Sequence, residues 1–229
     1  MKAIFCWSGG KDSSLALYRI QQEKKYEVVY LLTTLNEKHK RISMHGVREE
    51  LLDAQADVLD LPLLKVWVKE GTNSEYEQQM ERTLLKVKAE GIEHVIFGDI
   101  FLQDLRAYRE NNLAKVGMQA VFPLWNKDTL ALIHEFLDLG FRTITCCTND
   151  QYLGEEWVGK DINKQFVKDL PVIVDPCGEN GEFHSFCYAG PIFKEPIEII
   201  KGEKVYRPLE IKTLSSATKG FWFCELLKK

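Results

Sequence analysis

The sequence predicts an α/β protein in which helices flank a mostly parallel sheet, followed by a smaller C-terminal part of α+β type. Short apolar runs alternate with helical patterns through the first half of the chain, as expected for parallel strands that helices cover on both faces. Glycines follow the first apolar run directly, at the first turn from strand to helix. Beyond Asp150 the elements shorten and turn signals become frequent, which favours a second part of different construction.

The elements of the first half follow in order. Buried strands are expected at residues 2–7, 27–34, 63–68 and 94–97, which are short and largely apolar. Helices are expected between them, first at 13–23 and then where apolar residues recur at spacings of three and four. The two spaced sets are Val47, Leu51, Ala54 and Val58, and then Tyr76, Met80, Leu84 and Val87. This alternation is typical of a nucleotide-binding architecture.

The second half is expected to contain a helix, a strand and a terminal pair of strands. The helix should turn Leu130, Ile133, Phe136 and Leu137 inward, and a β-branched run at 141–145 follows it. The segments EKVYRPLEI and GFWFCELL predict antiparallel edge strands near the C-terminus. We expect two domains, residues 1–115 and 116–229.

Composition narrows the classes of protein. The chain has 229 residues, 45% hydrophobic and 28% charged, which is ordinary for a globular protein. A net charge of −4 argues against a chain-wide grip on nucleic acid. No apolar stretch approaches the roughly 18 residues that span a bilayer, and we expect a cytoplasmic protein. The six cysteines form no CxxC pair and are expected to be reduced. The oligomeric state is left open, with a homodimer among the alternatives.

The stretch SGGKDS, from Ser8 to Ser13, predicts an anion-binding turn. Gly9 and Gly10 permit positive φ and let backbone N–H groups approach an anion closely. The two serines add hydroxyl donors and Lys11 adds a point charge, so the expected ligand is a phosphate chain. The more common Walker loop is excluded, because Asp12 follows the lysine and the position of its first glycine is Phe5. The plainer alternative is a tight turn with a capping side chain.

SGGKDS after a first strand resembles the SGGxDS loop of the PP-loop ATP pyrophosphatases. The resemblance implies a Rossmann-like fold of the adenine nucleotide alpha hydrolase type, with residues 1–115 as the ATP-binding domain and 116–229 as the substrate-binding domain. It also implies that Ser8, Gly9, Gly10, Lys11, Asp12 and Ser13 hold the ATP phosphates, and that ATP is cut between its α- and β-phosphates. Asp12 would help to organise Mg²⁺ or the turn itself, and Mg²⁺ is implied by the charge of the triphosphate.

A second segment, DPCGENGEFHSFCYAGPIF, runs from Asp175 to Phe193. It resembles the diphthine-ammonia ligase family, in which CGE-x-GE-(F/Y)-H-T-F precedes a GP-x-F or AP-x-F element. Met44-His45 and the segment GDIFLQDLRAYRE, with Gly98 and Arg106, agree with that family. The resemblance covers residues 1 to about 195.

This resemblance implies a ligase that adenylates a carboxylate, releases pyrophosphate and lets ammonia displace AMP. The acceptor would be a carboxylate, as in diphthine on a protein such as elongation factor 2. Glu179, Glu182 and His184 are the candidates for handling ammonium or a cationic acceptor, while His45, Gly98 and Arg106 are candidates for the nucleotide site. Each has a plainer interpretation: the glutamates as loop charges, the histidines as a strand or helix-start residue, and the arginine as surface decoration. A metal site of Cys177, Cys187 and His184 matches no zinc spacing.

Departures from the family pattern leave the acceptor open. Asp99 stands where the family has alanine, and it adds negative charge beside the expected site. Ser185 replaces a threonine, and Asn180 occupies a position that is often glycine. Two alternatives are a PP-loop enzyme that modifies tRNA and a module that binds ATP without turnover. Thiolating relatives use paired cysteines, and Cys146-Cys147 would point to opposite faces of a strand.

Overall fold

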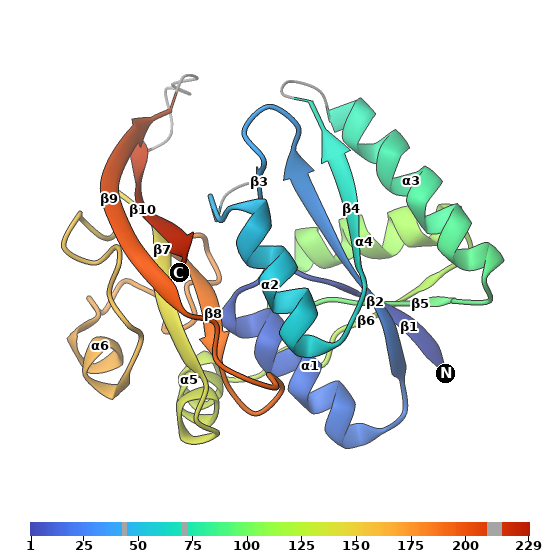
Figure 1. Cartoon of the computed structure of the whole chain (residues 1–229), viewed down its shortest axis with the longest axis horizontal. Helices are drawn as coiled ribbons and strands as arrows, with labels where there is room; N and C mark the ends of the chain where they lie inside the picture. Colours follow the sequence, from blue (N-terminus) through green and yellow to red (C-terminus); the bar gives the residue numbers. More distant parts are fainter. Residues whose placement is uncertain (43–44, 70–72, 210–216) are drawn as a thin grey trace.

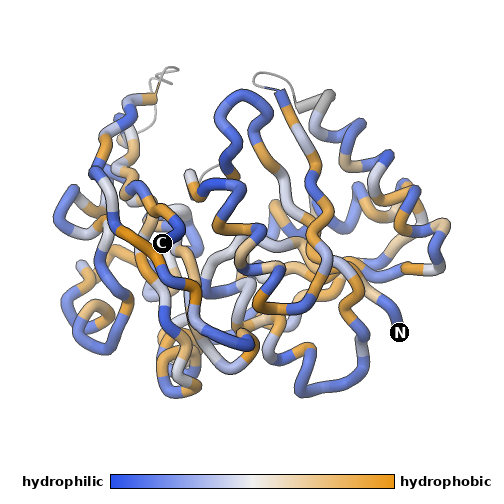
Figure 2. The backbone as a smooth tube through the Cα atoms, in the orientation of Figure 1, coloured by the Kyte–Doolittle hydropathy of each residue, from blue (hydrophilic) through white to orange (hydrophobic). Residues whose placement is uncertain are grey.

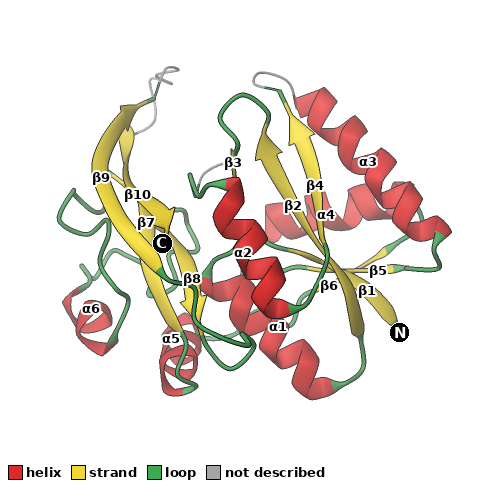
Figure 3. Ribbon diagram, in the orientation of Figure 1, coloured by secondary structure: helices red, strands yellow, loops and turns green. Residues whose placement is uncertain are grey.

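Two sheets form the protein, and helices lie between and around them (Figure 1). The computed structural model describes residues 1–42, 45–69, 73–209 and 217–229. A predominantly parallel sheet occupies the N-terminal half, and an antiparallel sheet occupies the C-terminal half (Figure 3). The predicted α/β class with a smaller C-terminal α+β part is confirmed.

The parallel sheet has the strand order β4-β2-β1-β5-β6, and the short β3 pairs antiparallel with the end of β2. This order reverses at β1, with β2 on one side and β5 on the other, so the carboxyl ends of β1 and β5 form a topological switch point where α/β folds bind ligands. The strands are β1 (Lys2–Cys6), β2 (Glu27–Asn36), β3 (Arg41–Ile42), β4 (Leu63–Val68), β5 (His94–Ile96) and β6 (Gln119–Val121).

Helices cover both faces of this sheet. The helices α1 (Lys11–Glu23) and α2 (Glu49–Leu59) lie between the two sheets, whereas α3 (Asn73–Ala89) and α4 (Gln103–Lys115) cover the opposite face (Figure 1). Helix α1 is capped by Lys24, which has a left-handed backbone conformation and donates its N–H to the Ile20 carbonyl. Val47, which we expected within the second helix, lies just before it and is buried.

The C-terminal sheet has the order β8-β7-β10-β9 and is antiparallel throughout. Its strands are β7 (Arg142–Asn149), β8 (Phe183–Ala189), β9 (Ile199–Pro208) and β10 (Gly220–Lys228), and α5 (Thr129–Asp138) and α6 (Lys164–Asp169) accompany it. The prediction of two terminal edge strands is half wrong: β9 is at the edge, but β10 lies between β7 and β9. The expected residues 210 and 211 of EKVYRPLEI lie outside the described residues.

Two further expectations need correction. Leu130, expected inward on α5, is 47% exposed, because Leu132, Ile133 and Phe136 form the buried face. The strand expected at 141–145 extends to Asn149, since β8 and β10 pair with it on its two sides. Hydrogen bonds to these two neighbouring strands stabilise β7 beyond the β-branched run from which it was predicted.

One hydrophobic core joins the two sheets. Apolar side chains from α1 and α2 pack with those of β7, β8 and β10 in a single buried cluster, which includes Leu17, Leu51, Ile144, Phe186 and Leu226. Figure 2 shows the hydrophobic positions gathered along the strands and inner helix faces, with hydrophilic residues at the outer turns. The expected domain boundary after residue 115 falls before β6, which still belongs to the parallel sheet. Among the described residues, no helix is both long and apolar enough to cross a membrane.

Candidate active site

The predicted phosphate loop connects β1 to α1 at the switch point. Gly9 has φ +77°, and a Cβ there would lie 2.7 Å from Oε1 of Gln55. A Cβ on Gly10 would lie 3.1 Å from the carbonyl oxygen of Ser185 and 3.3 Å from the His45 ring. Both glycines are therefore needed where this turn meets α2 and β8, which is a packing reason that the sequence did not reveal.

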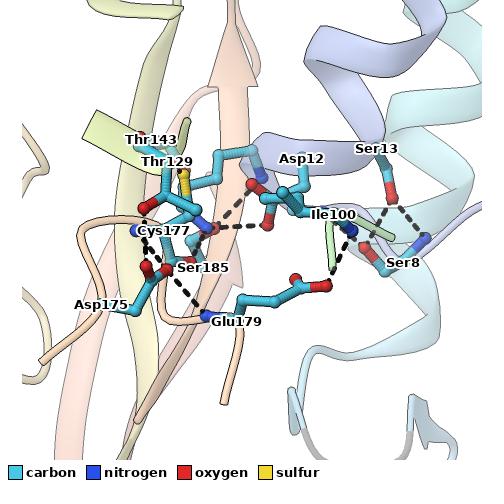
Figure 4. A network of polar contacts seen from close by, with 12 residues as sticks. Ser8, Asp12, Ser13, Ile100, Thr129, Thr143, Asp175, Cys177, Glu179 and Ser185 are labelled. Carbon is cyan, nitrogen blue, oxygen red and sulfur yellow. Dashed lines mark hydrogen bonds and ion pairs between the residues drawn. The ribbon is translucent and has the colours of Figure 1, made fainter. Parts of the chain in front are cut away.

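Serine hydroxyls organise the backbone of the loop (Figure 4). The hydroxyls of Ser8 and Ser13 are 2.7 Å apart, and Oγ of Ser8 accepts the N–H of Gly10 at 3.3 Å. The N–H of Lys11 donates to Oγ of Ser185 at 3.1 Å. The N–H groups of Gly10 and Lys11 thus donate to serine hydroxyl oxygens, and a hydroxyl group can rotate to act as a donor when an anion binds. The start of α1 adds its positive dipole end.

Lys11 and Asp12 form an ion pair of 2.7 Å at the first turn of α1. The lysine side chain is only 4% exposed, its Nζ also donates to the carbonyl of Cys177, and it lies over the Phe183 ring. Burial lowers the pKa of Lys11, but Asp12 and other neighbouring groups outweigh it, so the pKa is raised and the lysine stays charged. The Asp12 side chain is 29% exposed and faces the cavity described below.

The segment from Asp175 to His184 lies opposite the phosphate loop. Glu179 accepts hydrogen bonds from the N–H groups of Ile100 and Phe101 at 2.7 and 3.3 Å, which ties the loop after β5 to the C-terminal half (Figure 4). Burial raises the pKa of Glu179 to about 7, and nearby Asp12 adds to this. The carboxyl group is therefore near its protonation midpoint at neutral pH.

Glu182 has a different environment from Glu179. It is 1% exposed, and its carboxylate accepts three hydrogen bonds, one from Asp175 N–H and two from Asn180. Glu182 does not line the cavity. Its hydrogen bonds instead hold the loop from Asp175 to Glu182 in its conformation. Asn180, which departs from the family's usual glycine, supplies two of those donors.

Two histidines meet beside Lys11. The rings of His45 and His184 are 4.5 Å apart, and Nδ1 of His45 lies 3.3 Å from the Ser185 carbonyl. Burial lowers the pKa of His45 to about 4 and lowers that of His184 well below its usual range, so both rings are neutral at pH 7. Within the described residues, Nε2 of His184 has no hydrogen-bond partner. Met44, the neighbour that completed the predicted pair, lies outside the described residues.

One cavity of about 940 Å³ connects these groups. It opens at the carboxyl ends of β1, β2 and β5, and it is lined by Ser8, Lys11, Asp12, Ser13, His45, Gly98, Glu179 and His184, among others. Eight of the residues predicted for the site thus surround one space. Its size suits a nucleotide together with a second substrate.

Gly98 and Arg106 are placed differently from expectation. A Cβ on Gly98 would lie 3.0 Å from the backbone nitrogen of Ser13, so the glycine is required by the close approach of α1. Arg106 does not line the cavity: it pairs with Glu110 at 2.8 Å and lies over the rings of Phe122 and Trp125.

A different arginine reaches the cavity. Arg109 pairs with Asp99 at 2.6 Å, and both line the cavity wall. The charge of Asp99 is therefore balanced by Arg109, which lies three positions after Arg106, the residue expected from the resemblance. This pair has no local sequence signal, because Asp99 lies in the loop before α4 and only the fold brings it to the Arg109 side chain.

Gln55 was not predicted to take part in the site, but its side chain holds the phosphate loop in place. This fully buried residue of α2 accepts a hydrogen bond from the Trp7 indole and donates to the carbonyls of Gly9 and Cys187. The N–H of Cys187 also donates to the Gly9 carbonyl at 2.8 Å. The phosphate loop is thereby attached to β8 of the other sheet. A polar residue on the apolar face of a predicted helix was the available signal.

The fold and site define an α/β protein of the PP-loop type, with its glycine turn at the switch point of a doubly wound sheet. Residues 1–120 match the diphthamide synthase N-terminal domain, and residues 128–217 match the diphthamide synthase C-terminal domain. The chain belongs to the diphthamide synthase family.

Curated relatives carry the name diphthine–ammonia ligase. The zebrafish (Danio rerio) protein is 26% identical over 90% of this chain and 89% of its own length, and the mouse (Mus musculus) protein is 23% identical over 90% and 85%. The fission yeast (Schizosaccharomyces pombe) protein is 24% identical over 90% of this chain, which spans only 37% of that relative. A predicted tRNA methyltransferase subunit from Methanocaldococcus jannaschii aligns over 63% of this chain and 80% of its own, with a TM-score of 0.43 and 18% identity.

Proposed function

We propose that this protein is an ATP-dependent ligase that adenylates a carboxylate and transfers it to ammonia, with diphthine on a protein such as elongation factor 2 as the acceptor. The observation that carries the proposal is the cavity in which the phosphate loop faces Glu179 and the neutral pair of His45 and His184. The names of the curated relatives support the acceptor.

The phosphate loop would hold the terminal phosphates of ATP through the Ser8 and Ser13 hydroxyls and the N–H groups at the start of α1. Lys11 supplies positive charge that the buried ion pair keeps in place. Asp12 fits a magnesium ion, because Mg²⁺ in nucleotide sites binds one or two carboxylates together with phosphate oxygens. When bound, that ion would neutralise charge on the triphosphate. No cluster of three or more His, Cys, Asp or Glu side chains suited to a metal occurs among the described residues.

The reaction requires two displacements. The acceptor carboxylate attacks the α-phosphorus of ATP, and pyrophosphate leaves. Ammonia then attacks the acyl carbon, AMP leaves, and the new amide nitrogen loses one proton. Glu179, with its pKa near 7 and its place in the cavity, is the group we assign to accept that proton.

Purified protein should convert ATP, ammonium and elongation factor 2 carrying diphthine to AMP, pyrophosphate and the amidated factor. Mass spectrometry of the factor and chromatography of the nucleotides measure both products. Glu179→Gln should retain pyrophosphate–ATP exchange but lose most amide formation. ATP binding by calorimetry with no AMP under any of these conditions would instead identify a non-catalytic ATP-binding module. AMP formation that requires tRNA in place of the factor would favour a tRNA-modifying enzyme.

A further inference from the structure

A second cavity lies between α3 and α4, on the face of the parallel sheet away from the C-terminal sheet. Its volume is about 110 Å³, and its walls are mostly apolar or aromatic, with Tyr76, Met80, Leu84, Val95, Phe97 and Leu113 among them. An apolar cavity of roughly 150 Å³ admits a molecule as large as benzene. This cavity is therefore too small for a nucleotide and large enough for a small neutral molecule.

The small cavity adjoins the active-site cavity. The two cavities share five lining residues, which are Cys6, Tyr76, Met80, Phe97 and Arg109. The wall between the two cavities is therefore one side chain thick. The Arg109 guanidinium lies 4.4 Å from the centre of the Phe97 ring and is held by Asp99. Burial raises the pKa of the Cys6 thiol to about 12, so that side chain is neutral. The wall thus presents the Arg109–Asp99 ion pair among uncharged groups.

The outer end of the small cavity has charged side chains. Glu77 and Glu81, one turn apart on α3, are exposed and line it, and the Tyr108 hydroxyl donates to Glu77 at 3.2 Å. Lys115 also lines this end, and its Nζ donates to Asn112 at 2.8 Å. Because Arg109 is paired with Asp99, the remaining charges of the lining are two carboxylates and one ammonium group, and this excess of negative charge raises the local concentration of small cations.

We propose that the small cavity between α3 and α4 is the entrance through which ammonia reaches the active-site cavity. The inference rests on the proposed function, in which ATP and the acceptor fill the larger cavity and a third substrate needs a separate path. Ammonium collects at Glu77 and Glu81 and gives its proton to water there, so nitrogen enters as NH₃. The apolar walls disfavour the charged form, because it would have to give up its hydration to enter. Entry needs no other reactant, because ammonium loses one proton to water at this point. The second proton is the one that the amide nitrogen later gives to Glu179.

Blocking the entrance tests the proposal. Asn112→Trp places a large side chain at the outer end from the surface of α4, and Asn111→Trp is the matched control, since Asn111 is exposed and does not line the cavity. With diphthine-bearing elongation factor 2 as acceptor, Asn112→Trp should raise the KM for ammonium about tenfold or more, with the KM for ATP and pyrophosphate–ATP exchange unchanged. Asn111→Trp should resemble the wild type.

The double variant Glu77→Gln, Glu81→Gln provides a second test on exposed residues, where folding is not at risk. It should raise the KM for ammonium about threefold at low salt and show a weaker salt dependence than the wild type. An unchanged KM for ammonium in either the blocked or the double variant, with wild-type turnover intact, overturns the entrance. A wild-type protein that forms no amide from ammonium overturns the proposed function, and the entrance with it.

Discussion

At the scale of single residues, the structure separates side chains that face the cavity from those that shape it. Glu179 and Glu182 are three positions apart, yet Glu179 lines the cavity while Glu182 is buried under three hydrogen bonds. The sequence showed both as carboxylates in a glycine-rich loop. Which one lines the cavity depends on their partners in the folded chain: Glu179 accepts N–H groups of the loop after β5, whereas Glu182 accepts donors of its own loop.

Asp12 should be essential for nucleotide turnover. We expect Asp12→Asn to reduce pyrophosphate–ATP exchange by at least about a hundredfold, because the loop would lose the carboxylate that we propose for Mg²⁺ and Lys11 would be left with a neutral partner. Asp104→Asn, on the exposed first turn of α4, is the control. The exchange assay with labelled pyrophosphate measures the effect. Full exchange in Asp12→Asn would contradict the assignment of this loop.

His45 should make the protein sensitive to acid. Burial lowers its pKa to about 4 from the usual 6.5, so the folded state binds the proton less well than the unfolded state. The stability that the neutral His45 ring contributes to the folded state is fully present above pH 6.5, and it is lost progressively as the pH falls from 6.5 toward 4. The Tm of His45→Gln should therefore fall less between pH 7 and pH 5 than the Tm of the wild type does. Scanning calorimetry measures both values. His134→Gln, on the exposed side of α5, should behave like the wild type, and an equal Tm loss in His45→Gln would contradict the buried neutral ring.

At the scale of elements, helix α2 joins the phosphate loop to the second sheet. The position of α2 was predicted from the spacing of its apolar residues. Its attachment to the phosphate loop depends on one polar residue, Gln55, which lies among those apolar residues. The C-terminal end of the molecule is fastened to the same region, because Glu225 of β10 accepts hydrogen bonds from Arg41 and Arg48. Pairing between segments so distant in the chain has no local signal.

Replacing Gln55 with leucine should destabilise the protein and disturb the loop. The substitution removes the partner of the Trp7 indole and of the Cys187 carbonyl, and an unsatisfied buried polar group costs about 1–3 kcal/mol. We expect Gln55→Leu to lower the free energy of unfolding by about 2–4 kcal/mol and to weaken ATP binding. Urea unfolding and calorimetry measure the two effects. Gln22→Leu on the exposed face of α1 should change neither, and a fully stable Gln55→Leu would show that the loop does not need this tie.

At the scale of the whole molecule, one buried cluster of apolar side chains joins the two sheets. The buried cluster includes α1, α2 and three strands of the C-terminal sheet, and the larger cavity has walls from both halves. The site is complete only when the two halves are packed together. A binding event in the cavity should therefore stabilise both of them.

Unfolding should occur in a single cooperative transition. Because the two sheets share their buried apolar surface, exposing one removes the packing of the other. Circular dichroism and tryptophan fluorescence should report the same urea midpoint, and saturating ATP should raise both together. Fluorescence is informative because Trp7 lies at the end of β1 and Trp222 lies in β10. Two separate midpoints would contradict the shared core.

The sequence by itself determined the alternating elements, the glycine turn after the first strand and the family, because each depends on residue type and short-range spacing. The tertiary structure alone decided that β10 is an inner strand, that Arg109 instead of Arg106 reaches the cavity, and that Gln55 holds the loop. Those features depend on which faces meet after the chain has folded. Contacts between residues far apart in the chain are set by the packing of whole elements, and neighbouring residues carry no record of them.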